Sequence, residues 1–183
     1  QSSFKDDSIK YFMEQLANLN VNTSDGSDQT GSYKIISISG NTPDGKIMVY
    51  HNYYLYDDKE FILTDLTIES SAELSSNYMA PVYTTDSSEI LPEGNNKNLW
   101  VPYDNDKWVR YHNLDFGIPV SGYEVGAVYN EDSRNGLIMG SVQHDIWKTG
   151  VYSLTSDKNE LIRLELAAGV TSNETRDVLP HGK

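Results

Sequence analysis

The feature that most constrains the fold is a series of short apolar and β-branched runs separated by turn-forming residues, which begins at Ser32. In the run over residues 61–69, Ile62, Leu66 and Ile68 follow the period of a half-buried strand with one break. The intervening clusters are rich in Asn, Asp, Gly and Ser, which favour chain reversals. We therefore predict strands at residues 33–39, 46–56, 61–69, 123–129, 136–144 and 160–168. This spacing predicts an all-β fold, an antiparallel, supersandwich-like β-sandwich.

The N-terminal residues follow a different period. Apolar side chains recur at spacings of 3, 1, 3 and 3, which predicts a short helix over residues 4–19. The stripe consists of Ile9, Phe12, Met13, Leu16 and Leu19. Residues 20–31 are polar and predict a linker, and residues 84–98 predict a loop. The expected organisation is a helix and linker over residues 1–31, then a β-sandwich domain over residues 32–183 that is a fragment of a larger chain.

Charge narrows the choice of partners. The chain has 27 acidic and 14 basic residues and a formal net charge of −13, so it repels nucleic acid and anionic membrane surfaces. It has no cysteine, which excludes disulfides, thiolate zinc sites and a cysteine nucleophile. No stretch approaches the roughly 20 apolar residues of a membrane span. We expect neutral ligands and no membrane insertion, and the polar, lysine-poor composition favours export to the periplasm or cell surface.

All three tryptophans lie in two clusters of aromatic and polar residues, at 100–108 and 144–150. A flat apolar ring beside carboxylates and amides suits the apolar face and the hydroxyl edge of a sugar ring. The candidate sugar-binding residues are Trp100, Tyr103, Asp104, Asp106, Trp108, His144, Asp145 and Trp147. The same combination can instead cap the core of a β-sandwich. A shared sugar site requires that the two clusters meet in space.

Neither cluster by itself predicts catalysis or a metal site. Asp104, Asn105 and Asp106 offer oxygen ligands for calcium, but they lack the spacing and glycine of a calcium loop and are ordinary turn residues. His144 and Asp145 are adjacent, so on a strand their side chains point to opposite faces and form no dyad. The sequence contains no nucleophile elbow, phosphate loop or zinc-binding helix motif. We predict no catalytic residue, no metal and no cofactor, with calcium as the weaker option.

Four segments carry a resemblance to a known family. They are residues 61–66 (FILTDL), 76–81 (SNYMAP), 103–111 (YDNDKWVRY) and 140–150 (GSVQHDIWKTG). Their order resembles the N-terminal β-sandwich of bacterial α-galactosidase-like glycoside hydrolases, of the melibiase clan, over roughly residues 32–183. The resemblance implies that a (β/α)₈ barrel of about 250 residues, with two catalytic aspartates, follows the sandwich. No catalytic residue carries over to this chain. Asp104, Asp106, Trp108 and Trp147 are the positions from which it could reach the rim of the barrel's active site.

The leading hypothesis is therefore a non-catalytic N-terminal domain of a carbohydrate-active enzyme. It supports the barrel of the parent chain and contributes contacts to an oligo- or polysaccharide. A free-standing carbohydrate-binding module is the first alternative, and it predicts an exposed, coplanar row of aromatic rings. A structural or adhesion sandwich without a ligand is the second, and it predicts that the tryptophans are buried. A hydrolase in its own right would need two carboxylates about 5–9 Å apart in one cleft.

Overall fold

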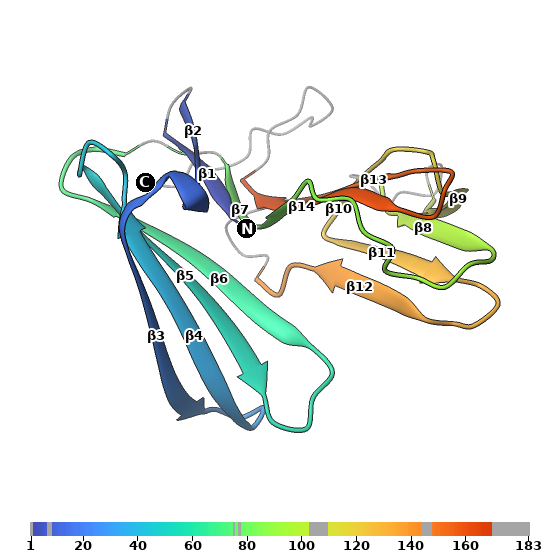
Figure 1. The fold of residues 1–183 in the computed structure, drawn as a ribbon, viewed down its shortest axis with the longest axis horizontal. Helices are drawn as coiled ribbons and strands as arrows, with labels where there is room; N and C mark the ends of the chain where they lie inside the picture. Colours follow the sequence, from blue (N-terminus) through green and yellow to red (C-terminus); the bar gives the residue numbers. More distant parts are fainter. Residues whose placement is uncertain are drawn as a thin grey trace. The chain divides into compact units, whose positions relative to one another are not determined.

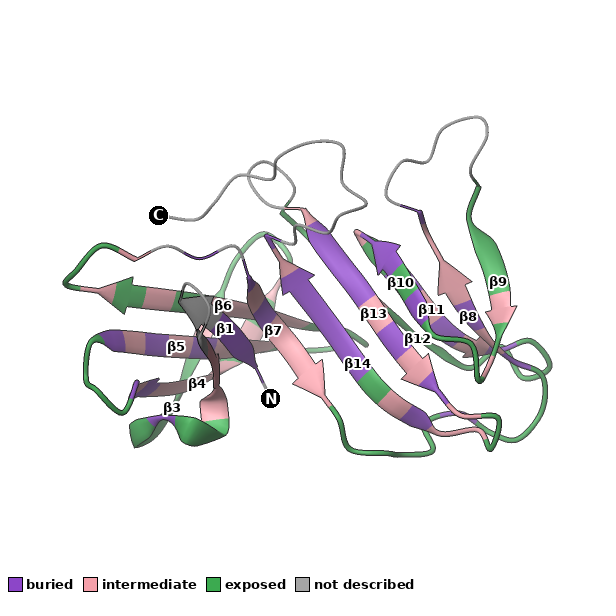
Figure 2. Cartoon of the chain, turned by 90° about the horizontal axis from the view of Figure 1, so that it is seen from above, coloured by how far each residue is buried: buried purple, intermediate pink, exposed green. Residues whose placement is uncertain are grey.

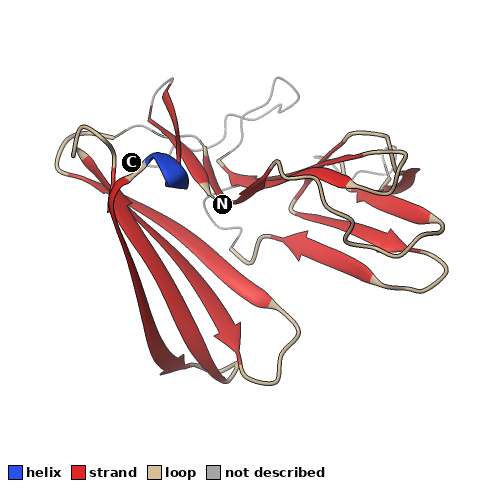
Figure 3. Cartoon of the chain, in the orientation of Figure 1, coloured by secondary structure: helices blue, strands red, loops and turns tan. Residues whose placement is uncertain are grey.

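The computed structural model describes residues 2–6, 9–74, 76, 78–102, 110–143 and 148–169. These residues form an almost entirely β structure with antiparallel sheets, which confirms the predicted all-β sandwich class (Figure 3). The one helical element among them is a single 3-10 turn, Met13–Gln15. The chain divides into two compact units, Gln1–Pro81 and Val82–Gly182. Residue 31, after which we expected the domain boundary, lies in the turn between two paired strands of the first unit.

The first unit is built around a four-stranded meander (Figure 1). Its strands lie side by side in chain order: β3 (Ala17–Ser27), β4 (Ser32–Asn41), β5 (Ile47–Tyr56) and β6 (Ile62–Ser70). In the predicted turn after β4, the Thr42 hydroxyl donates a hydrogen bond to Asp44 (2.6 Å), and Gly45 has a φ of +73°. The strands predicted at residues 33–39, 46–56 and 61–69 are thus confirmed, with small shifts at their ends.

Residues 2–12 form a hairpin rather than the start of a helix. Its strands are β1 (Ser3–Asp6) and β2 (Ile9–Phe12), and β1 also pairs with β7 (Met79–Thr84). The helix predicted over residues 4–19 is therefore wrong. Tertiary packing outweighs the apolar period, because Phe4 stacks on Tyr11 of the adjacent strand with ring centroids 5.2 Å apart. Leu16 is buried in the same core cluster as Phe4.

The linker predicted over residues 20–31 is also wrong, because its first eight residues belong to β3. This strand pairs with β4 from Asn20–Ser39 to Ser27–Ser32 and forms the edge of the sheet. Almost all of its side chains are exposed, so Asn, Thr and Ser suit both of its faces and hide the strand in the sequence pattern. The turn begins at Asp28, whose carboxylate accepts a hydrogen bond from the N–H of Thr30 (2.7 Å).

The core of the first unit covers only part of the meander. Ile47 and Val49 of β5 are 3% and 1% exposed, and they pack with Phe4 and Leu16. Alternate residues of a strand point to opposite faces, so His51 is buried on the same face as Val49. Val21 also lies on this face, because the register pairs it with Ile38, and Ile38 with His51. Its side chain is nevertheless 60% exposed.

The second unit is a sandwich of two sheets. One sheet has the order β12 (Gly136–Gly140), β11 (Val125–Asn130), β8 (Asn96–Trp100), β9 (His112–Asp115). The other contains β10 (Val120–Tyr123), β13 (Thr149–Thr155) and β14 (Leu161–Ala168) as neighbours. The strands predicted at residues 123–129, 136–144 and 160–168 correspond to β11, β12 and β14. The loop predicted over residues 84–98 ends three residues earlier than expected, because β8 begins at Asn96.

The two sheets of the second unit meet in a mixed apolar and polar interior. Val151, Leu164 and Leu166 of β13 and β14 form the apolar part, and Met139 of β12 packs against them. Figure 2 shows β13 and β14 as two of the most continuously buried strands. Asn98 of β8 is fully buried and donates a hydrogen bond to the hydroxyl of Thr155 in β13 (3.1 Å). The predicted hairpin at residues 130–135 is confirmed as the β11–β12 turn.

Candidate functional site

The structure describes one of the eight candidate sugar-binding residues. Trp100 is the last residue of β8. The other seven lie outside the described residues: Tyr103, Asp104, Asp106, Trp108, His144, Asp145 and Trp147. We call residues 103–109 and 144–147, which lie outside the described residues, the two tryptophan segments. The structure does place residues on either side of both, and these flanks show where each segment joins the described fold.

The flanks of both segments converge on Glu124, at the corner between β10 and β11. Next to this residue, the N–H of Tyr123 donates to the carbonyl of Val101, which precedes the first segment (2.9 Å). Glu124 itself accepts a hydrogen bond from the N–H of Ser141, which precedes the second segment (2.9 Å). The N–H of Glu124 donates to the carbonyl of Thr149, which follows the second segment (2.8 Å). The described flanks of both tryptophan segments therefore lie at the same end of the second unit.

Local geometry makes this corner tight. Glu124 has a φ of +65°, a left-handed conformation that is uncommon for a non-glycine residue. Its carboxylate accepts a further hydrogen bond from the N–H of Thr149 (3.2 Å), which helps to hold this conformation. Close approach also requires glycine at position 140, because a Cβ there would lie 2.6 Å from the carbonyl oxygen of Glu124. Strained backbone of this kind is often found at functional sites.

Trp100 is held firmly at this end of the sandwich. Its indole N–H donates to the carbonyl of Ser121 in the facing sheet (2.8 Å). Its ring stacks on His112 of β9, with centroids 5.6 Å apart and planes 11° from parallel. The side chain is half-buried. Trp100 therefore helps to join the two sheets of the second unit.

Tyr111 is an exposed aromatic residue that sequence reasoning did not select. It directly precedes β9 and follows the first tryptophan segment, and it is 63% exposed. Its position in the segment 103–111, between Arg110 and His112, was the available signal. An exposed phenol ring offers both an apolar face and a hydroxyl group.

The first unit carries a second polar and aromatic group, on the face of the meander opposite to Val49. A hydrogen-bonded row crosses three strands there. The Ser37 hydroxyl donates to Asn52 (2.7 Å), and the Asn52 amide donates to Asp65 (2.9 Å). Tyr54 donates to the other oxygen of Asp65 (2.6 Å), and this bond raises the pKa of Tyr54 to about 12. The alternation of Tyr and Asn at positions 50, 52 and 54 was the sequence signal for this face.

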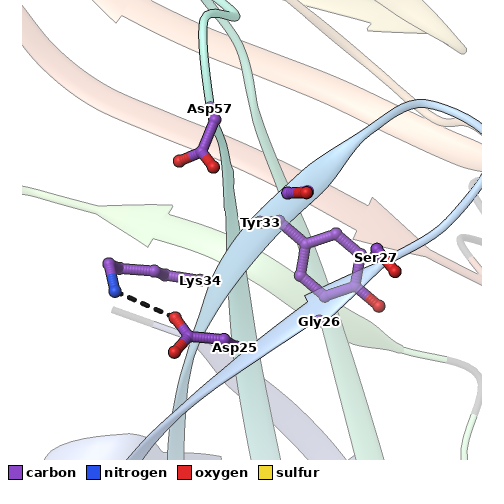
Figure 4. A pocket seen from close by; sticks show the side chains of 7 residues that line it. Asp25, Gly26, Ser27, Tyr33, Lys34 and Asp57 are labelled. Carbon is purple, nitrogen blue, oxygen red and sulfur yellow. Dashed lines mark hydrogen bonds and ion pairs between the residues drawn. The ribbon is translucent and has the colours of Figure 1, made fainter.

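A shallow hollow lies near the β3–β4 turn of the same sheet (Figure 4). Its lining includes Tyr33, Asp57 and the ion pair of Lys34 with Asp25 (2.9 Å), whose side chains are 71% and 81% exposed. The ion pair raises the pKa of Lys34, mainly through its hydrogen bond to Asp25. Both charges are solvated and already paired, so this hollow offers little binding energy to a ligand.

Among the described residues, His51 is a histidine whose pKa is altered by its surroundings. Burial is the main cause that lowers its pKa to about 4. The Thr64 hydroxyl donates to the carbonyl of Asn52 (2.9 Å), so its oxygen is left to accept from Nε2–H of His51 (2.8 Å). Nδ1 then accepts from the hydroxyl of Tyr53 (3.2 Å). This neutral ring has both nitrogens satisfied, which is the arrangement of a core histidine.

Metal binding and membrane insertion find no support in the described part of the chain. No three His, Asp or Glu side chains gather there in a way that could hold a metal ion. The aspartates considered for calcium, Asp104 and Asp106, lie outside the described residues. Among the residues described, no helix has the length and apolar character to cross a membrane.

Comparisons with known proteins add no family. No family model, no curated protein and no solved structure matches this chain.

Proposed function

We propose that this chain is a non-catalytic β-sandwich domain of a carbohydrate-active enzyme of α-galactosidase type, and that it contacts sugar at the Glu124 end of the second unit. The observation that carries the proposal is the attachment of both tryptophan segments to one corner. Two segments that each carry tryptophan and carboxylate residues start within one hydrogen-bonded cluster. This proximity is what a shared sugar site requires.

The proposed mechanism is ring stacking combined with hydroxyl recognition. Trp108 and Trp147 supply flat apolar surfaces for the axial C–H face of a pyranose ring, and Asp104 and Asp106 accept hydrogen bonds from its hydroxyl groups. A neutral sugar suits a chain of net charge −13, because it carries no charge for the acidic surface to repel. In the parent enzyme this end of the sandwich would face the barrel that carries the catalytic aspartates.

A structural sandwich without a ligand is the second candidate. The specific observation in its favour is Trp100, whose ring is half-buried and whose N–H is bonded to Ser121. If Trp108 and Trp147 were packed against the sandwich and hydrogen-bonded to it as Trp100 is, no stacking surface would remain for a sugar.

Calorimetric titration of the chain with melibiose, raffinose and galactomannan tests the proposal. We expect saturable binding to at least one of these α-galactosides, and loss of binding in both Trp108→Ala and Trp147→Ala. Tyr54→Phe is the matched control, because it removes an aromatic hydroxyl from the polar row of the first unit and should leave binding unchanged.

The three variants also separate the two candidates. Loss of binding in only one tryptophan variant would mean that the two segments do not form one site. Absence of binding to all three saccharides, in a chain whose unfolding remains cooperative, would instead favour the structural sandwich.

A further inference from the structure

β12 forms one edge of its sheet, and no other described strand pairs with its outer side. Its sequence, GLIMG, contains neither a charged residue nor proline. Charged residues and proline are the features by which natural proteins usually prevent an edge strand from pairing with another chain. A bare edge of five apolar or glycine residues is therefore a template for strand addition.

The two ends of the β11–β12 ladder show which of its pairs are hydrogen-bonded. At one end, the N–H of Asn130 donates to the carbonyl of Asn135 (2.8 Å). At the other end, the N–H of Ser141 donates to the carbonyl of Glu124 (2.9 Å). Bonded and non-bonded pairs alternate along an antiparallel ladder, and the register is continuous between these two pairs.

This alternation determines the direction of every backbone group in β12. Leu137 and Met139 belong to bonded pairs, so their N–H and C=O groups point toward β11. The N–H and C=O groups of Gly136, Ile138 and Gly140 point away from β11, toward the open edge. The edge therefore presents three donors and three acceptors to an incoming strand.

Side chains leave this backbone uncovered. A Cβ at Gly136 would lie 2.8 Å from the Cβ of Tyr129, so packing against β11 keeps this position free of a side chain. Ile138 is 78% exposed and offers an apolar side chain for a cross-strand contact.

A hollow of about 530 Å³ lies beside the first half of β12. Leu137 lines it, together with Ile90 and Pro92 of the preceding loop and Leu161 of β14. Leu137 and Ile90 are 43% and 39% exposed, so the hollow is apolar and open to solvent. A strand added to β12 would direct alternate side chains to the face on which Leu137 lies, where this hollow can receive one of them.

The charges around the edge indicate what kind of segment fits. Glu89 and Glu93 lie in the loop that lines the hollow, and Glu131 and Asp132 lie in the turn that leads into β12. All four side chains are exposed, and Arg134 is the one cation in these two segments. Basic residues on the incoming strand would be attracted, whereas a second copy of this chain would bring the same acidic groups.

We propose that β12 binds an extended, basic segment of a partner protein by strand addition. An apolar side chain of the partner enters the hollow beside Leu137, and flanking Lys or Arg residues pair with the surrounding carboxylates. The outward backbone groups of Gly136, Ile138 and Gly140 supply the main-chain hydrogen bonds.

Fluorescence anisotropy with a labelled peptide of sequence RVKLVKV tests the proposal on the whole chain. Ile138→Pro removes only the outward N–H at the centre of the edge, at a position where proline is tolerated in an edge strand. We expect this variant to weaken binding by about tenfold or more. Ile138→Thr keeps the N–H and is the matched control, with binding expected within about threefold of the unsubstituted chain.

Two further measurements keep the test independent of how well the proline variant folds. In the unsubstituted chain, amide exchange of Ile138 should slow when the peptide is added, because its N–H becomes hydrogen-bonded. The double variant Glu89→Gln, Glu93→Gln should weaken binding and reduce its dependence on salt.

Several outcomes would overturn the proposal. One is unchanged exchange of the Ile138 amide at saturating peptide, and another is equal binding of the acidic peptide EVELVEV. Absence of binding at millimolar peptide would do the same. A dimer in light scattering that Ile138→Pro converts to a monomer would make a second copy of the chain the occupant of this edge.

Discussion

The two four-stranded sheets of this protein place the same side chain in opposite environments. In the β12-β11-β8-β9 sheet, Asn98 is fully buried, and it bridges to Ser153 and Thr155 of the facing strand (both 3.1 Å). In the β3-β4-β5-β6 sheet, Asn52 is half-buried and bonds along the surface to Ser37 and Asp65. The difference is the presence of a second sheet over β8. Hydrogen bonds between sheets are hard to replace, whereas water can replace those along a surface.

Apolar residues repeat this contrast within the first unit alone. Val49 and Val21 lie on the same face of the meander, but they are 1% and 60% exposed. Phe4 and Leu16 cover Val49 but do not cover Val21. The stability of this unit therefore depends on one end of the sheet.

Replacement of the buried asparagine should have the largest effect on stability. Asn98→Ala leaves the hydroxyl groups of Ser153 and Thr155 without their partners in the interior, at a cost of about 2–4 kcal/mol in unfolding free energy. Asn52→Ala is the matched surface variant and should cost less than about 1 kcal/mol. Urea unfolding followed by circular dichroism measures both. Equal losses in the two variants would contradict the contrast between the sheets.

Acid should destabilise the first unit through His51. Its pKa is about 4 when folded and 6.5 in the unfolded chain, so the unfolded state binds the proton first as the pH falls. The stabilisation is complete above about pH 6.5, declines as the pH falls toward 4, and amounts to about 3 kcal/mol in total.

Comparison with His51→Gln isolates this contribution to the acid sensitivity. The difference in unfolding free energy between the two chains should fall between pH 6.5 and pH 4. His112→Gln, at an exposed histidine of β9, is the matched control for the replacement of an imidazole by an amide. A difference that stays constant over this pH window would show that His51 can be protonated without loss of the fold.

The two valines give the sharpest test within a single sheet face. Val49→Ala should cost about 2–3 kcal/mol, because it removes buried methyl groups and leaves a cavity beside Ile47 and Phe4. Val21→Ala should change stability by less than about 0.5 kcal/mol. Chemical unfolding of both variants provides the measurement. A large loss in Val21→Ala would reveal that something covers the exposed end of the sheet in solution.

The polar row of the first unit should be visible in tyrosine titration. Asp65→Asn removes the carboxylate that raises the pKa of Tyr54 to about 12, so this pKa should fall toward the ordinary value of 10.0. The difference in ultraviolet absorbance between this variant and the double variant Asp65→Asn, Tyr54→Phe isolates the titration of that phenol. A pKa that remains near 12 would exclude Asp65 as its cause.

The smallest effect is expected at the exposed ion pair. Lys34→Ala should leave stability unchanged within error, because both partners are largely solvated and the pair is screened by salt. Thermal unfolding at low and high salt measures this. A salt-dependent loss of stability would mean that the β3–β4 turn contributes more than its exposure indicates.

Local chemistry was predictable wherever neighbouring residues decide the structure. The turn at Thr42–Gly45 depends on the Thr42–Asp44 hydrogen bond and on a glycine with positive φ, and both are evident from composition. The strands on either side are rich in isoleucine and tyrosine, which favour strands, so their place in the sequence was clear. β3 was missed because an edge strand exposed on both faces needs no apolar alternation.

The candidate site was predictable in composition but not in geometry. The tryptophan segments stand out in the sequence because they combine indole rings with carboxylates and amides. Nothing in their residues shows that Tyr123 and Glu124, between the two segments in sequence, bind flanks of both. That relation follows from the pairing of β10, β11 and β13 and from the left-handed backbone of Glu124.

The sequence by itself determined the β class, the turns and the aromatic segments, because these depend on residues within a few positions of one another. Only the tertiary structure decided which apolar residues are covered, which asparagines are buried and which edge is left open. Each of these depends on contacts between strands far apart in the chain. Leu16 is buried with Phe4 against β5, for example, although it belongs to an apolar stripe whose spacing fits a helix, because burial of apolar surface in a shared core outweighs local periodicity.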